Sequence, residues 1–91
     1  MKTQEPTNYE QVISEIWSEI LQKNGIGLDA DFFDLGGTSQ QLIHVVSKMG
    51  ERFNLPLDTT IVLDGVTISA LAKSVQRFAA APELQVASNA N

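Results

Sequence analysis

Apolar residues recur at helical spacing in the first third of the chain. Between residues 9 and 21 they fall three or four positions apart, and acidic side chains fall between them. This period is typical of an amphipathic helix with one buried face. A capping box of Thr7 and Glu10 predicts the start of the helix, and Asn24-Gly25 predicts its end. The predicted buried stripe is Tyr9, Val12, Ile13, Ile16, Trp17, Ile20 and Leu21.

A second helix is predicted from Thr38 or Ser39 to about Phe53, where Asn54-Leu55-Pro56 ends it. At about 100° per residue, its apolar residues fall within one arc. Gly50 lies outside that arc, where it either allows a close approach of another segment or marks a weak last turn. The core-facing arc is predicted to hold Leu42, Val45, Val46, Met49 and Phe53.

Two further elements follow. Asp58 and Gly65 bound a segment that suits a short capped helix, although its β-branched residues are also compatible with a strand. A lone strand would have no pairing partner, so the short helix is favoured. Thr67 is predicted to cap a last helix that ends near Phe78. Its stripe is Ile68, Leu71, Ala72, Val75 and Phe78.

A long connection from Ile26 to Thr38 joins the first two helices. It carries Ile26, Leu28, Phe32, Phe33 and Leu35, and is therefore expected to pack onto them. Asp29 is expected to cap a short turn that contains both phenylalanines. Core packing is the expectation for both of them, and also for Trp17.

Together these elements predict an all-α fold, a small four-helix bundle of three main helices plus one short helix. The 91 residues suit one domain, with a flexible N-terminus at 1–6, a helical domain at 7–78 and a flexible tail or linker at 79–91. Nothing is long and apolar enough to cross a membrane, and no signal peptide is recognised. A monomer in the cytoplasm is the expectation.

The composition excludes several kinds of function. A net charge of −5 argues against nucleic acid as a partner, because phosphate binding needs clustered Lys and Arg. The absence of cysteine rules out disulfides and thiolate zinc sites. Asp29, Asp31 and Asp34 are close in sequence but lack the glycine and the distal glutamate of a calcium-binding loop. No metal is therefore predicted.

The stretch from Asp31 to Leu42 carries the candidate chemistry. Its Gly36-Gly37 pair allows a sharp turn, and Thr38 and Ser39 follow at a helix start. Unpaired N–H groups and the positive end of the helix dipole favour an anion there. We therefore expect Ser39 to carry a phosphate-linked group, with Gly37 and Thr38 beside it in the cofactor-binding site.

A catalytic role for Ser39 is disfavoured. The single histidine, His44, lies roughly 140° around the same helix, which makes direct proton transfer between the two doubtful. A nucleophile elbow would need a second glycine after the serine, and Gln41 stands there. No catalytic residue is predicted, and the chain is not expected to be an enzyme.

The residues Asp31-Phe32-Phe33-Asp34-Leu35-Gly36-Gly37-Thr38-Ser39 resemble the phosphopantetheine attachment motif of carrier proteins. The resemblance covers about residues 9–78. It is closest to the peptidyl carrier (thiolation) domains of nonribosomal peptide synthetases and of hybrid polyketide assembly lines. It implies an acyl-carrier-protein-like fold and a covalent 4'-phosphopantetheine, transferred from coenzyme A to Ser39 by a separate phosphopantetheinyl transferase.

The resemblance also implies a function. The thiol of the arm holds acyl or aminoacyl intermediates as thioesters and shuttles them between biosynthetic enzymes. The implied partners are adenylation, condensation, ketosynthase, acyltransferase or thioesterase-type enzymes. Two positions depart from the family pattern: Gln40 stands where Leu or Ile is usual, and Thr38 where Asp, His or Asn is common. Both leave the attachment prediction in place and make the docking surface unusual.

The helix surface beside Ser39 is the predicted partner-binding surface: Gln40, Ile43, His44 and Ser47. The segment from Gln40 to Phe53 holds Lys48, Arg52 and Glu51, a formal charge of +1, unlike the acidic helix of fatty-acid carriers. Apolar and hydrogen-bonded docking is therefore favoured over a salt-sensitive mode. The alternative is a small helical docking or scaffold module without a prosthetic group.

Overall fold

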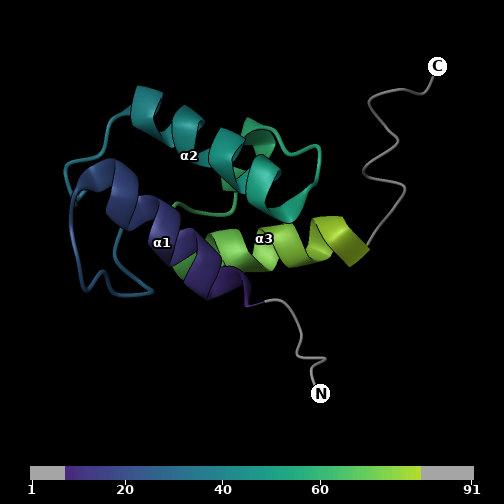
Figure 1. Cartoon of the computed structure of the whole chain (residues 1–91), viewed down its shortest axis with the longest axis horizontal. Helices are drawn as coiled ribbons and strands as arrows, with labels where there is room; N and C mark the ends of the chain where they lie inside the picture. The colour runs from purple at the N-terminus through teal and green to yellow at the C-terminus, as the bar shows by residue number, and fades with distance from the viewer. Residues whose placement is uncertain (1–7, 81–91) are drawn as a thin grey trace.

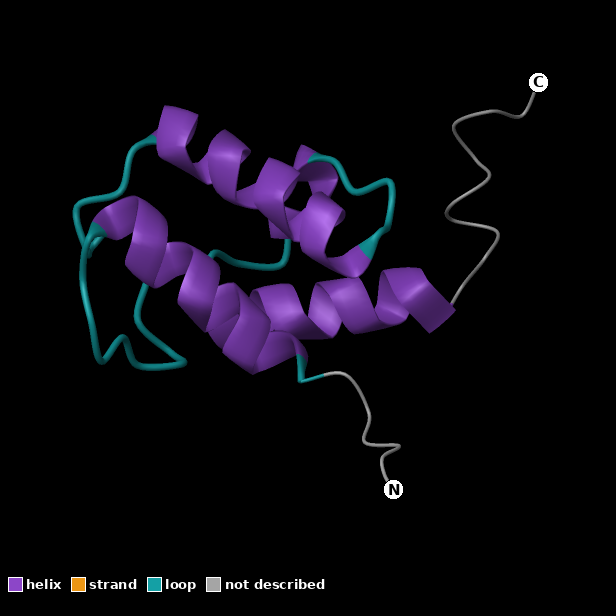
Figure 2. Cartoon of the chain, in the orientation of Figure 1, coloured by secondary structure: helices purple, strands orange, loops and turns teal. Residues whose placement is uncertain are grey.

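The computed structural model describes residues 8–80, so the predictions for residues 1–6, for Thr7 and for residues 81–91 fall outside it. α1 packs against both α2 and α3, and η1 packs against α3 (Figure 1). Figure 2 shows helices and loops, and no strand, in the described part of the chain. The elements in chain order are α1 (Tyr9–Leu21), α2 (Ser39–Phe53), the 3₁₀ helix η1 (Thr59–Val62) and α3 (Ile68–Ala80).

The predicted all-α fold of three main helices and one short helix is therefore confirmed. η1 is the short element, and it is a 3₁₀ helix where the β-branched residues had also allowed a strand. α2 has the predicted bounds. α3 runs to Ala80, two residues beyond the expected boundary at Phe78.

Two of the predicted helix caps are present. The Thr67 hydroxyl accepts a hydrogen bond from the Ala70 N–H at 3.0 Å. The Asp58 carboxylate accepts from the hydroxyl and from the backbone N–H of Thr60. Both bonds favour the charged form and therefore lower the pKa of Asp58. The bond from the hydroxyl has the larger effect and the bond from the backbone N–H the smaller.

The ends of α1 differ from the prediction. Asn8, and not Thr7, is the N-cap, and its Oδ1 accepts from the Gln11 N–H at 3.0 Å. The helix therefore starts at Tyr9, and Gln11 takes the position expected for Glu10. At the other end Gln22 adopts a left-handed conformation with φ of 59°, so α1 ends before Asn24-Gly25.

The core lies where the three main helices meet. Trp17 and Phe32 are both fully buried, and their rings meet edge to face with centroids 4.9 Å apart. The core prediction is confirmed for these two residues and for the apolar arc of α2 except Phe53, which is partly buried and packs against the core. The buried apolar set is Ile13, Ile16, Trp17, Phe32, Leu42, Val45, Val46, Met49, Ile61, Ile68, Leu71, Ala72 and Val75.

The core prediction is wrong for Phe33, which is 45% exposed. Leu28, in the loop that was expected to pack onto the helices, is 44% exposed. Asp31, and not Asp29, caps the turn that contains the two phenylalanines. Its carboxylate accepts hydrogen bonds from the N–H groups of Phe33 and Asp34. The rings of the two consecutive phenylalanines meet edge to face with centroids 5.8 Å apart, but only Phe32 is buried. Only Phe32 reaches Trp17.

Gly50 allows a close approach, one of the two roles left open for it. A Cβ at this position would lie 3.1 Å from the carbonyl oxygen of Leu55. The Leu55 N–H also donates to the Gly50 carbonyl at 3.1 Å. The chain leaving α2 therefore folds back tightly on the last turn of the helix. Among the described helices, none is both long and apolar enough to span a membrane.

Candidate functional site

The loop between α1 and α2 ends at Ser39, the first residue of α2. Two backbone hydrogen bonds attach this loop to the first turn of α3 and to the segment just before it. The Phe32 N–H donates to the Val66 carbonyl at 3.0 Å, and the Ser69 N–H donates to the Leu28 carbonyl at 3.0 Å. Figure 1 shows the loop passing the end of α1 before it rises to the start of α2. The long loop is therefore fixed at two points, Leu28 and Phe32.

The Gly36-Gly37 pair makes the final turn, and the two glycines act differently. Gly36 has φ of +95°, a conformation that side-chain-bearing residues rarely adopt. Gly37 instead provides space, because a Cβ there would lie 2.3 Å from a ring carbon of Phe32. The Gly37 N–H also donates to the Phe32 carbonyl at 3.0 Å. The prediction of a sharp turn is confirmed, and the Phe32 ring is the reason that position 37 has no side chain.

Thr38 is the N-cap of α2 and forms a reciprocal capping box with Gln41. The Thr38 hydroxyl accepts from the Gln41 N–H at 3.1 Å, and the Gln41 Oε1 accepts from the Thr38 N–H at 2.9 Å. Sequence reasoning missed Gln41 as a site residue. The T-x-x-Q spacing was a readable signal for it.

Ser39 is the first residue of α2 and is exposed. The capping box satisfies the N–H groups of Thr38 and Gln41, and the Leu42 N–H donates to the Thr38 carbonyl at 2.9 Å. The described residues provide no acceptor for the N–H groups of Ser39 and Gln40. The first turn of α2 holds no acidic residue. An anion at this point meets two free N–H groups, the positive end of the helix dipole and no carboxylate in that turn.

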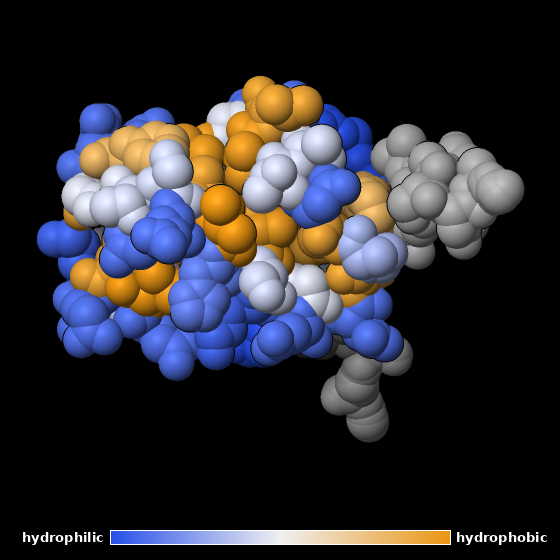
Figure 3. All heavy atoms as spheres, turned by 90° about the horizontal axis from the view of Figure 1, so that it is seen from above, coloured by the Kyte–Doolittle hydropathy of each residue, from blue (hydrophilic) through white to orange (hydrophobic). Residues whose placement is uncertain are grey.

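The predicted partner surface is solvent-facing. Gln40, Ile43, His44 and Ser47 are all exposed, and Ile43 is 56% exposed. Seen from the side of α2, the apolar surface is divided into separate patches by polar residues (Figure 3). Ile43 is thus an exposed apolar residue among the polar side chains of Gln40, His44 and Ser47.

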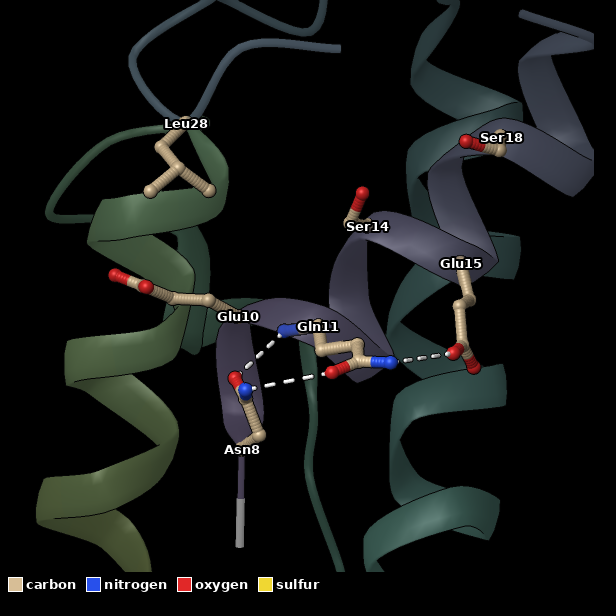
Figure 4. Close-up of a pocket in the computed structure, with 7 residues that line it drawn as sticks. All are labelled: Asn8, Glu10, Gln11, Ser14, Glu15, Ser18 and Leu28. Carbon is tan, nitrogen blue, oxygen red and sulfur yellow. Dashed lines mark hydrogen bonds between the residues drawn. The ribbon is translucent and has the colours of Figure 1, made fainter. Parts of the chain in front are cut away.

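A polar groove of about 540 Å³ runs along α1 (Figure 4). One of its lining residues, Glu15, forms an ion pair with Arg52 in the last turn of α2, 3.0 Å between the charged atoms. Ser39 lies at the opposite end of that helix, roughly 20 Å away along its axis at 1.5 Å per residue. No residue of α2, Ser39 included, lines the groove. Among residues 8–80 there is no cluster of three or more potential metal ligands.

Comparison with known proteins identifies the family. The family model described as "Phosphopantetheine attachment site" matches residues 11–75. The chain belongs to this family, the carrier domains that bear a covalent 4'-phosphopantetheine.

Individual relatives agree with this assignment. Syringomycin synthase SyrB1 of Pseudomonas syringae pv. syringae is 41% identical over 68 residues, which are 75% of this chain and 11% of that protein. The chain thus spans about a tenth of that relative, and smaller shares of other curated relatives that it matches.

Solved structures also match. BlmI, a type-II acyl carrier protein from Streptomyces verticillus involved in bleomycin biosynthesis, has a TM-score of 0.73 and 27% identity, covering 78% of this chain and 86% of BlmI. A peptidyl carrier protein solved with the transferase Sfp and coenzyme A has a TM-score of 0.71 and 26% identity, covering 84% of this chain and 99% of that one.

The start of α2 fits the prosthetic group of this family. A phosphodiester needs an accessible hydroxyl and a surrounding that tolerates negative charge. The exposed Ser39 hydroxyl, the two free N–H groups and the absence of acidic residues in the first turn meet both requirements.

Proposed function

We propose that Ser39 is the phosphopantetheine attachment site and that the chain is a non-catalytic carrier in a nonribosomal peptide or related assembly line. One observation carries the proposal: an exposed serine opens α2 within the residues matched by the attachment-site family. When bound, phosphopantetheine supplies a thiol on a flexible arm, which can hold an acyl or aminoacyl group as a thioester.

The chemistry at Ser39 is a group transfer in which this chain is the acceptor. The Ser39 oxygen forms a bond to the phosphorus of coenzyme A that bears the pantetheine arm. The bond from that phosphorus to the adenosine bisphosphate portion breaks, and adenosine 3',5'-bisphosphate leaves. The hydroxyl proton passes to a base of the transferase. The chain itself need only expose the hydroxyl and stabilise the new phosphodiester with the N–H groups of Ser39 and Gln40.

The partners are proposed from the surface and from the relatives. The transferase is the first, since a similar carrier was solved with Sfp and coenzyme A. Adenylation, condensation, ketosynthase, acyltransferase or thioesterase-type enzymes follow, and the likeness to a syringomycin synthase favours those of a peptide pathway. Gln40, Ile43, His44 and Ser47 are the residues proposed to contact them.

The experiment is incubation of the purified chain with coenzyme A and a broad-specificity phosphopantetheinyl transferase, followed by intact mass measurement. The proposal predicts that nearly all of the protein gains the mass of one phosphopantetheine. A chain that remains unmodified, while a known carrier in the same tube is converted, would point instead to a docking module without a prosthetic group.

Docking through Ile43 gives a separate prediction. Ile43→Asp places a charge on the exposed apolar contact, so we expect transferase KM to rise about tenfold while the fold is retained. Leu63→Asp is the control, because Leu63 is 80% exposed but follows η1 and lies outside the proposed surface. Steady-state kinetics of both variants test this, and equal KM values would contradict a role for Ile43.

A further inference from the structure

We infer that the exposed face of α3 is a docking surface for an acidic segment of a partner protein. Lys73, Gln76 and Arg77 define this basic surface, and all three are exposed. Three observations support it: the distribution of charge along the chain, the way in which Arg77 is held, and the hollow beside Lys73. The inference goes beyond the proposed carrier function and does not require modification of Ser39.

Positive charge in this acidic chain is concentrated on α3. Residues 8–67 carry nine carboxylates and three cations, a formal charge of −6. α3 has two cations, Lys73 and Arg77, and no acidic residue, a formal charge of +2. The two cations lie four residues apart on one side of the helix, a spacing at which like charges repel and slightly destabilise it. Folding therefore gains nothing from this placement, whereas an acidic partner is attracted by both charges.

Arg77 is held in place and is still available to a partner. Its guanidinium forms an ion pair with Asp64, the second residue after η1, and the Asp64 carboxylate also lies 3.5 Å from the Ser74 hydroxyl. The Arg77 side chain nevertheless stays 65% exposed. Because a guanidinium has five N–H donors, the pair with Asp64 leaves donors for a second carboxylate. The side chain is thus oriented before a partner binds, which lowers the entropy cost of binding.

Lys73, unlike Arg77, forms no ion pair within residues 8–80. It borders a hollow of about 300 Å³, which the small side chains of Ser69 and Ala70 leave open one turn nearer the start of α3. A carboxylate that enters the hollow meets the Lys73 ammonium and the Ser69 hydroxyl. Lys73 and Arg77 are about 6 Å apart along the helix axis. A partner segment with two acidic side chains one helical turn apart matches that spacing.

This basic surface is separate from the surface beside Ser39. α3 packs against α1 and η1, and Figure 1 shows α2 along the upper side of the molecule and α3 along the lower side. No residue of α2 lines the hollow. A partner held on α3 therefore leaves Ile43 and His44 open to a second enzyme. Contact at two separate surfaces raises the effective concentration of one partner when the other is bound in the same assembly.

The test is a titration of the isotope-labelled chain with a hexaglutamate peptide, followed through the backbone amide signals in NMR spectra. At about 20 mM salt we expect the shifted signals to lie in residues 69–77, and the affinity to fall about fivefold at about 150 mM salt. Lys73→Glu should weaken binding about tenfold and Lys73→Gln about threefold. Lys23→Glu is the matched control, because Lys23 is exposed just after α1 and the change in net charge is the same. It should bind within about twofold of wild type.

The inference is overturned if Lys73→Glu binds the peptide like wild type, if Lys23→Glu loses binding equally, or if the shifted signals lie on α2. It is also overturned if inorganic phosphate produces the same shifts, which would indicate a small-anion site, or if the signals of α3 shift with protein concentration alone, which would indicate a second copy of the chain. Lys73→Glu should be modified by the transferase within about twofold of wild type. A wild-type chain that binds the peptide but is not modified would contradict the proposed function and not this inference.

Discussion

Replacement of Ser39 by alanine should abolish modification by the transferase completely. The expected loss is total because no other residue combines an exposed hydroxyl with the free N–H groups at the start of α2. The neighbouring hydroxyl of Thr38 already accepts from the Gln41 N–H, so its use would break the cap. Intact mass after incubation with coenzyme A and a transferase measures the effect.

The fold should be unaffected by this change. The Ser39 side chain is exposed and makes no hydrogen bond to the rest of the described chain, so the free energy of unfolding should change by less than about 0.5 kcal/mol. Ser14→Ala, on α1, is the matched control and should be modified like wild type. Modification of Ser39→Ala at the wild-type rate would show that the group is attached elsewhere.

Gly37→Ala should be the most destabilising small substitution in the loop. The added Cβ would lie 2.3 Å from the ring of Phe32, which cannot retreat because it is fully buried against Trp17. Overpacking of this kind costs about 1–3 kcal/mol, a large part of the stability of so small a domain. Equilibrium urea unfolding gives the change in free energy.

Two further variants distinguish the steric clash with Phe32 from a general effect of replacing glycine by alanine. Gly27→Ala is the control, because a Cβ there meets nothing within 4 Å and its φ is not positive. It should leave stability unchanged or raise it slightly. Combining Gly37→Ala with Phe32→Leu should recover part of the loss, since the two positions are in contact. The explanation fails if Gly37→Ala and Gly27→Ala have equal stability.

The helices were the most predictable part of the fold. Hydrophobic period located α1, α2 and α3, and the caps at Thr67 and Asp58 were correct because local side-chain bonds determine them. The end of α1 was not predictable in the same way. Both Gln22 and Gly25 have positive φ, and the helix ended at the first of them, which the sequence signal for glycine did not indicate.

The loop was harder to predict because it has no period. Two consecutive phenylalanines gave equal reason to expect burial, and the structure buries one of them. What separates them is the turn that Asp31 caps, together with the reach of Phe32 to Trp17, a contact between residues distant in sequence. Gly37 leaves space for the ring of Phe32, and the sequence motif alone does not predict this contact.

The serine and its face were predicted correctly as exposed because they depend on helix geometry alone. Once α2 starts at Ser39 and its apolar arc is buried, the side chains of Ile43 and His44 must face solvent. The capping partner Gln41 was missed, although its spacing from Thr38 is a local signal. The sequence thus located the exposed start of α2 and carried a local signal for its cap.

The most direct test of the central claim is to locate the modified residue. After incubation of the wild-type chain with coenzyme A and transferase, cleavage after lysine and arginine releases the peptide of residues 24–48, whose hydroxyl side chains are Thr38, Ser39 and Ser47. Fragmentation of this peptide in a mass spectrometer assigns the group to one of them. We predict phosphopantetheine on Ser39; the group on Thr38, on Ser47 or on another peptide would contradict the account.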